Sequence, residues 1–398
     1  MIVWTCRLTM LIIGIYILMR LSQRRFKFNF TEKPKETKFE RAKSNESTLQ
    51  KGHTNISSAM PNSVIYQLSR HYPIWNRSTT PYAWCHARHE INSGLLFVKI
   101  DKCASTTGMG VTLRVADTLG RRLLGDGQLT TRKPCFARYL HGYASTGDRD
   151  YLHRREDQSF LWSIVRNPAS RVLSAYFFFE VSRLNRTATE DSMLRYVSQP
   201  SWKTHLVEYL RLKEFNTRKK EIAHIFQNYD FVAVSERMEE SIVVLSLLLR
   251  VPLADVIVLS SKESGGYDDG MSKSGCVKIR KKWSTPRIDE YMQREFLKHN
   301  FDYLLYQIAN ASLDKTIHAL GRDNVDAGIQ LYRTLQSKNE NSCFQKAIFP
   351  CPKVLPNHTY LSRRDCYSQD SGCGHKCTDT ALQSESSEQW QALTLGSS

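Results

Sequence analysis

Two short runs of apolar residues stand out along the chain, and the first is followed by a helix-like pattern. Residues 95–100 and 160–165 are almost entirely apolar and rich in β-branched and aromatic side chains. Runs of this length are typical of strands covered on both faces of a sheet, although periodicity alone does not exclude a buried helix. After the first run, Met109, Leu113 and Ala116 recur at spacings that place them on one helical face. The pattern therefore predicts a strand, a turn and a helix, in that order.

The same alternation continues towards the C-terminus. Residues 229–236 predict a strand, and the helix after it would carry Glu239 and Glu240 in its first turn, where acidic side chains complement the helix dipole. Residues 256–259 predict a further strand and residues 302–320 a further helix. Because strands that alternate with helices favour a parallel sheet with helices on both faces, the predicted fold class is α/β.

The turn after the first predicted strand has the sequence Lys102-Cys103-Ala104-Ser105-Thr106-Thr107-Gly108. Backbone N–H groups are free at a helix N-terminus and the helix dipole is positive there, so a phosphate or sulfate would be stabilised. The order differs from the Walker pattern GxxxxGK[ST], because the lysine comes first and the glycine last. Taken alone, the hydroxyl residues fit an ordinary N-cap equally well.

The second apolar run leads into Arg166-Asn167-Pro168-Ala169-Ser170-Arg171-Val172-Leu173-Ser174. Asn167 is a favourable N-cap, and Pro168 at the first helical position loses no hydrogen bond. Arg166 would then end a strand, while Ser174 would lie two turns into the helix. This placement would let a guanidinium and a hydroxyl contact one phosphate from two sides.

Together these two stretches resemble the sulfotransferases that use 3'-phosphoadenosine 5'-phosphosulfate (PAPS). The similarity is greatest to the Golgi membrane-bound enzymes that act on carbohydrate, notably the galactose 3-O and uronyl 2-O sulfotransferases. In that family a K-x-x-S-[ST]-T loop binds the 5'-phosphosulfate, and an R-[DN]-P-x-x-R-x-x-S-x-[YF] stretch binds the 3'-phosphate. Asp101 beside the lysine and Asn167 in place of the commoner aspartate depart from the family pattern. The resemblance implies a P-loop-like fold, PAPS as co-substrate, no metal, and nucleotide contacts from Lys102, Cys103, Ser105, Thr106, Thr107, Arg166 and Ser174.

The resemblance also implies a catalytic base and a charge-stabilising group. Sulfuryl transfer to a hydroxyl needs a general base near the acceptor oxygen, and histidine suits this task. The uronyl 2-O relatives carry His-Gly-His where this chain has His141-Gly142-Tyr143, so the implied base is His141 alone. Lys102 would stabilise charge on the transferring group. His153 and Glu90 are the alternative bases, and a structural role for the first histidine stays open.

The densest basic cluster spans residues 278–283 and precedes Thr285-Pro286, which predicts the start of a helix that ends near His299. In related sulfotransferases a basic loop before the last helices contacts the 3'-phosphate or the acceptor. The resemblance therefore adds Lys281 to the predicted nucleotide contacts. The alternative is a solvated basic turn.

The first residues of the chain predict where the protein resides. Residues 2–21 are mostly apolar and reach the roughly 20 residues that a membrane-spanning helix needs. Because no small-x-small cleavage site follows, an uncleaved signal anchor is favoured over a removed signal peptide. The predicted parts are a cytosolic tip and anchor at 1–21, a flexible stem at 22–80, a sulfotransferase domain at 81–330, and a Cys-rich extension with a disordered tail at 331–398.

The net charge of the chain indicates what kind of partner it binds, and its glycosylation sequons indicate its cellular compartment. The net charge of +17 suits a protein that binds anions. Nucleic acid is the usual partner of such a chain, but no nucleic-acid motif occurs, so a multiply charged nucleotide and an acidic glycan fit better. The basic residues after the anchor would favour a cytosolic body. Seven N-x-[ST] sequons, many cysteines and the resemblance to lumenal enzymes outweigh them and favour a lumenal catalytic domain. The resemblance implies that this is a single-pass type II protein of the Golgi membrane.

Ten cysteines remain to be assigned. With Cys6 in the anchor and Cys103 in the phosphate loop, an even number is left, which in a lumenal chain predicts disulfides whose pairing spacing does not reveal. Five of them lie between residues 343 and 377 beside His358 and His375, so a zinc site is the alternative, although no C-x-x-C occurs.

The sequence thus predicts a sulfotransferase that transfers a sulfuryl group from PAPS to a hydroxyl of a glycan, glycolipid or proteoglycan. Two other functions stay open. One is a membrane-anchored carbohydrate-binding protein that keeps the fold without the chemistry. The other is a P-loop kinase, which would need a Walker-type loop and an acidic Mg²⁺ ligand that the chain does not show convincingly.

Overall fold

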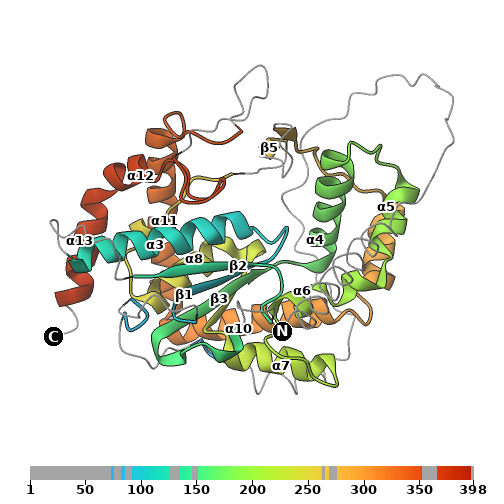
Figure 1. The fold of residues 1–398 in the computed structure, drawn as a ribbon, viewed down its shortest axis with the longest axis horizontal. Coiled ribbons are helices and arrows are strands. Elements are labelled where there is room, and N and C mark those ends of the chain that lie inside the picture. The colour runs from blue at the N-terminus through green and yellow to red at the C-terminus, as the bar shows by residue number, and fades with distance from the viewer. Residues whose placement is uncertain are drawn as a thin grey trace, which may run out of the picture. The chain divides into compact units, whose positions relative to one another are not determined.

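Four parallel strands form the central sheet of the computed structural model (Figure 1). Their order is β2-β1-β3-β4, with β1 at Gly94–Lys99, β2 at Ala137–His141, β3 at Ser159–Val165 and β4 at Phe231–Val234. Every residue of β1 and of β3 is buried, as expected for strands covered on both faces. The predicted α/β fold with a parallel sheet is confirmed.

The structure describes residues 73–75, 82–85, 92–124, 135–145, 151–261, 265–268, 276–351 and 365–395, all within the unit Ile56–Ser398. The predicted anchor, most of the predicted stem and Glu90 lie outside these residues. Among the helices described, none is both long and apolar enough to cross a membrane.

Helices cover both faces of the sheet (Figure 1). Helix α3, Ser105–Leu124, lies over one face, and α10, Phe301–Leu320, lies on the other. The approach of α3 requires glycine at position 108, because a Cβ atom there would lie 2.5 Å from the Phe97 ring and 2.8 Å from Ile164. The strand, turn and helix predicted for this stretch are confirmed.

The other helical elements follow in chain order. The predicted cap of α4 is present, because the Asn167 side chain accepts hydrogen bonds from the N–H groups of Ala169 and Ser170. The bounds are α4 Pro168–Ala175, continuing as a π-helical turn at Tyr176–Arg183, α5 Glu190–Val197, α6 His205–Leu210, α7 Arg218–Asn228, α8 Met238–Leu249, α9 Pro286–Tyr291, α11 Arg322–Cys343, α12 His375–Ala381 and α13 Gln383–Leu395. A hairpin pairs β5, Tyr267–Asp268, with β6, Val277–Lys278.

The strand predicted at 256–259 is wrong. Val256 ends a short 3-10 turn, Leu253–Val256, and the residues after it join no strand ladder in the described part of the chain. They are nonetheless buried, and the carbonyl of Val258 accepts a hydrogen bond from Gln336 of α11. The apolar run is therefore a buried segment that packs beside α11. A buried strand would have the same kind of sequence, which is why the two could not be told apart.

Two predicted domain limits also need correction. Trp75 lies within the predicted stem, yet it is 3% exposed, stacks on Phe226 and donates its backbone N–H to Thr316 of α10. The predicted limit at residue 330 falls inside α11, whose Gly328 packs so closely on Val243 of α8 that a Cβ would lie 2.7 Å away. The folded unit therefore begins before residue 81 and continues past 330 without a break.

The predicted disordered tail is wrong for residues 383–395, which form α13. Polar anchors hold this helix: Arg122 of α3 contacts both Asp255 and Ser386, and the backbone N–H of Ala254 donates to Gln389. Polar side chains of α13 thus contact Arg122 of α3 and the neighbouring residue Ala254, while Trp390 packs against the hydrophobic core.

The cysteine prediction is confirmed, since the eight cysteines form four disulfides. The pairs are Cys85–Cys135, Cys276–Cys351, Cys343–Cys377 and Cys366–Cys373. These bonds use all the cysteines that the zinc alternative would need. Among the described residues Cys103 is the free cysteine, and it is buried.

The two C-terminal disulfides give a prediction about stability. Cys343–Cys377 spans 34 residues and Cys366–Cys373 only 7. Loop-closure entropy predicts a loss of about 4 kcal/mol for the double serine variant of the first and about 2.5 kcal/mol for that of the second. Equilibrium unfolding in urea measures both. The opposite order of the two losses would contradict the entropic argument.

Candidate active site

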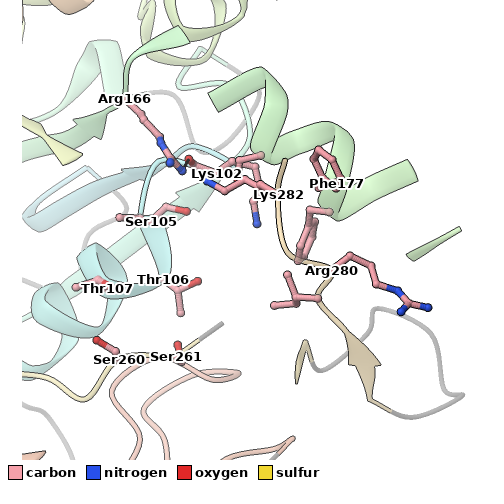
Figure 2. Close-up of a pocket in the computed structure, with 14 residues that line it drawn as sticks. Lys102, Ser105, Thr106, Thr107, Arg166, Phe177, Ser260, Ser261, Arg280 and Lys282 are labelled. Atoms are coloured by element: carbon pink, nitrogen blue, oxygen red, sulfur yellow. Dashed lines mark hydrogen bonds between the residues drawn. The ribbon is translucent and has the colours of Figure 1, made fainter. Parts of the chain in front are cut away.

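A cavity of about 320 Å³ lies where β1 and β3 end, at the carboxyl edge of the sheet (Figure 2). Ligands of open α/β sheets bind at this edge. Lys102, Arg166, Arg280 and Lys282 bring four cations to it, and no carboxylate is among its described lining residues. The full lining is Lys102, Ala104, Ser105, Thr106, Thr107, Arg166, Ser174, Phe177, Phe178, Ser260, Ser261, Ile279, Arg280 and Lys282.

The turn between β1 and α3 supplies one wall of the cavity. Lys102 and Ala104 both adopt the left-handed conformation, with φ of 64° and 55°. Non-glycine residues in this conformation cost about 1 kcal/mol or more each and are concentrated at functional sites. The first N–H groups of α3 have no acceptor within the helix. The turn therefore presents backbone donors and three hydroxyls, those of Ser105, Thr106 and Thr107, to the cavity.

The second predicted stretch meets the first in this same cavity. Arg166 donates from Nη1 to the backbone carbonyl of Lys102 at 3.1 Å, and Ser174 of α4 also lines the cavity. Glu236 lies near the arginine, at 3.8 Å from its Nε, and accepts from the backbone N–H of Asn167. Two segments that are far apart in the sequence thus face one space, as binding of a single ligand requires.

Aromatic side chains and the basic loop complete the walls. Phe177 and Phe178 come from the π-helical turn after α4, and the Nζ of Lys102 lies 3.5 Å from the centroid of the Phe178 ring. Figure 2 shows Lys102, Arg166 and Lys282 on one side of the cavity and Ser260 and Ser261 on the other.

Crowded cations make the cavity attractive to an anion. Burial and then the charge of Arg166 lower the pKa of Lys282 from its ordinary value, although Glu236 acts in the opposite direction. A bound anion would relieve this repulsion.

Two predicted nucleotide contacts do not line the cavity. Cys103 is fully buried, and burial raises the pKa of its thiol to about 12, so its side chain belongs to the core. Lys281 lies outside the lining, while its neighbours Arg280 and Lys282, which are likewise exposed, lie within it. The predicted basic loop thus reaches the cavity through these two neighbours, and a contact from Lys281 stays a prediction.

The lining also includes residues that the sequence analysis did not assign to the site. Phe177 and Phe178 follow the serine of the second motif in an aromatic run, which is a signal that could have found them. Ser260 and Ser261 follow the buried segment mistaken for a strand, and no local signal marks them.

His141 lies next to the cavity rather than in its lining. The parallel register of β1 and β2 pairs it with Lys99, and its Nε2 lies 3.3 Å from Oδ1 of Asp101, the residue before Lys102. A carboxylate accepts hydrogen bonds but does not donate them, so the neutral imidazole would carry its hydrogen on Nε2 and a lone pair on Nδ1. His153 does not line the cavity either.

The carboxyl of Asp101 stays ionised beside this histidine. Burial raises its pKa, but the hydrogen bond and charge of His141, together with Lys99 and Lys102, outweigh burial and lower the pKa below its ordinary value. The charge of Asp101 also reaches His205 and Tyr209 of α6.

The fold and the cavity define an α/β protein with a cavity lined by basic and hydroxyl side chains at the carboxyl edge of its sheet. Residues 86–307 match the family model described as the sulfotransferase family. Because this match covers more than half of the 398 residues, the chain belongs to the sulfotransferase family. A comparison with curated proteins finds no match.

Proposed function

We propose that this protein transfers the sulfuryl group of PAPS to a hydroxyl of a carbohydrate acceptor. Family membership indicates sulfuryl transfer. The observation that carries the proposal is the cavity itself, in which Lys102 and the hydroxyls of one segment face Arg166 and Ser174 of another without a carboxylate among the described lining residues. PAPS carries anionic groups at two ends, and this arrangement offers donors to both.

Different residues of the cavity would hold the two anionic ends of PAPS. Lys102 and the N–H and hydroxyl groups at the start of α3 would hold the 5'-phosphosulfate, and Arg166 and Ser174 the 3'-phosphate. The acceptor oxygen attacks sulfur, the bond between sulfur and the bridging phosphate oxygen breaks, and 3',5'-ADP leaves. The lysine and the backbone donors stabilise the negative charge that develops on the leaving phosphate.

The acceptor proton needs a base, which we assign to His141. Its Nδ1 carries the lone pair when Nε2 donates to Asp101. Asp101 would then be a positioning residue, because it fixes the tautomer and stabilises the imidazolium that forms.

We also propose that the catalytic domain lies in the Golgi lumen, behind an N-terminal anchor. Four disulfides suit an oxidising compartment, and the sequon at Asn185 lies on an exposed loop. Glycosidase treatment of the protein from cells is expected to increase its mobility. An unchanged mobility together with titratable free thiols would place the domain elsewhere.

The central experiment supplies the full-length protein with radiolabelled PAPS and a panel of desulfated glycans. Labelled glycan and 3',5'-ADP are expected in equal amounts. Turnover of ATP instead of PAPS would favour a kinase. Binding of PAPS and glycan without release of 3',5'-ADP would favour a carbohydrate-binding protein. Either result would overturn the proposed activity.

The basic loop supplies a matched pair of variants. Lys282→Ala is expected to weaken binding of 3',5'-ADP roughly tenfold, because it removes a charged donor from the cavity. Lys281→Ala removes the same charge from the neighbouring position, which does not line the cavity, and is expected to change the affinity less than about twofold. Titration calorimetry measures both. Equal losses would mean that only the overall charge of the loop matters.

A further inference from the structure

A row of partly exposed aromatic rings begins beside the Asp101–His141 pair. Its first ring, Tyr143, is 39% exposed, and the backbone N–H of Ala144 donates to the carbonyl of Tyr209, which holds the loop against α6. Neighbouring ring centroids lie 4.8, 4.7, 5.0 and 5.2 Å apart along the row. This row, named here the aromatic strip, consists of Tyr143, Tyr209, His205, Trp202 and Tyr196.

The far end of the aromatic strip leads back to the nucleotide cavity. The ring of Tyr196 lies 5.3 Å from that of Tyr176, which lies 5.3 Å from that of Phe177, and Phe177 lines the cavity. The strip therefore adjoins the proposed active site at both ends. A molecule lying on it would have one part next to His141.

The rings of His205, Tyr209 and Tyr196 carry no charge near neutral pH. Burial and the charge of Arg171 lower the pKa of His205 to about 3, and burial and the charge of Asp101 raise the pKa of Tyr209 to about 12. Burial likewise raises the pKa of Tyr196. Tyrosine and tryptophan combine an apolar ring with a polar edge, which matches a sugar ring with its C–H faces and hydroxyl edges.

Two buried donor atoms at the strip, one on Arg171 and one on Trp202, favour a ligand rich in oxygen. The guanidinium of Arg171 lies 5.1 Å from the centroid of the Trp202 ring, and the residue is 2% exposed. Its Nη2 and the Nε1 of Trp202 both lack a hydrogen-bond partner in the described structure. A buried donor without a partner is costly, so a ligand that supplies acceptor oxygens here would be favoured.

We propose that the aromatic strip binds the sugar chain of the acceptor, and that the substrate is therefore an oligosaccharide or polysaccharide of several sugars rather than a single sugar or a small alcohol. This inference rests on the proposed function. The continuity of the strip with the Asp101–His141 pair places one sugar for reaction while its neighbours stack on the other rings.

The test measures KM with PAPS and a series of acceptors of one to six sugars. KM of the wild-type protein is expected to fall as the chain lengthens. Trp202→Ala and Tyr143→Ala are expected to raise KM roughly fivefold for the longer acceptors, since a stacked ring contributes at that level. Trp202→Phe keeps an aromatic ring, so its KM is expected to lie much closer to that of the wild-type protein than to that of Trp202→Ala.

The controls separate this inference from the proposed function and from misfolding. Phe344→Ala removes a partly buried ring of the C-terminal extension, which lies 5.9 Å from the ring of Phe349 in a tilted arrangement, and should leave the dependence on chain length intact. Tyr143 is exposed, so its variant tests the strip even if Trp202→Ala fails to fold. Sulfation with a KM that does not depend on chain length would contradict binding of the sugar chain by the aromatic strip, while the proposed function would stand. Absence of sulfation with every glycan, despite PAPS binding, would overturn the proposed function.

Discussion

Lys102→Gly is expected to lower kcat roughly 10³-fold while the free energy of unfolding changes by about 1 kcal/mol or less. The loss of rate follows from removing the one cation that the phosphate loop contributes to the cavity. Deleting a donor that stabilises charge in a transition state costs about 10²–10³ in rate, and a full positive charge belongs at the upper end of this range.

Stability stays nearly constant because two effects of this substitution oppose each other. The left-handed conformation of Lys102, with φ of 64°, suits glycine better than lysine and favours the variant by about 1 kcal/mol. The contact between its Nζ and the Phe178 ring, at 3.5 Å, is lost and disfavours the variant by about 1 kcal/mol. Thermal unfolding and single-turnover kinetics on the same preparation measure both quantities.

Arg250→Gly serves as the matched control for the backbone effect. Arg250 caps α8 in the same left-handed conformation, with φ of 54°, and does not line the cavity. Its glycine variant should gain stability and keep wild-type turnover. Wild-type turnover in Lys102→Gly would remove the lysine from the mechanism.

The features that the sequence predicted well are those fixed by neighbouring residues. The buried strand β1 and the Asn167 cap of α4 depend on local patterns, which is why the phosphate loop and the arginine were predicted at the carboxyl edge of the sheet. The sequence did not show which side chains of the basic loop line the cavity, because their direction depends on the backbone path between β6 and α9, which charge density does not encode.

The features that the sequence did not predict depend on contacts between residues that lie far apart in the chain. The pairing of Asp101 with His141 depends on the register between β1 and β2. Helix α13 looked like a disordered tail because it binds through Arg122, and Trp75 looked like part of the stem because its partners lie in α7 and α10. In each case the partner lies far away in the sequence, where no local pattern reveals it.

His141→Ala is expected to lower kcat by roughly 10²–10⁴-fold, the usual contribution of a general base. Asp101→Asn keeps the shape of the side chain and removes its charge, so a smaller loss is expected. The amide oxygen can still accept the hydrogen bond from the imidazole, but it no longer stabilises the imidazolium that forms. Single-turnover kinetics with saturating PAPS and acceptor measure both losses.

The groups around this pair keep a constant charge near neutral pH. Asp101 has a lowered pKa, burial and the charge of Arg171 lower the pKa of His205 to about 3, and burial and the charge of Asp101 raise the pKa of Tyr209 to about 12. These three groups therefore do not change charge between about pH 5 and 9. The charges of Lys99 and Lys102 also act on this carboxylate and help to lower its pKa.

Wild-type kcat in His141→Ala would assign the base to another residue. A large loss of kcat in His141→Ala, with a smaller loss in Asp101→Asn at unchanged KM, would support the histidine as the base and the aspartate as its positioning residue. A purely structural role for Asp101 would lower the free energy of unfolding, and urea unfolding of Asp101→Asn measures it. Lys281→Ala, whose charge lies outside the cavity lining, controls for general electrostatic effects on the rate.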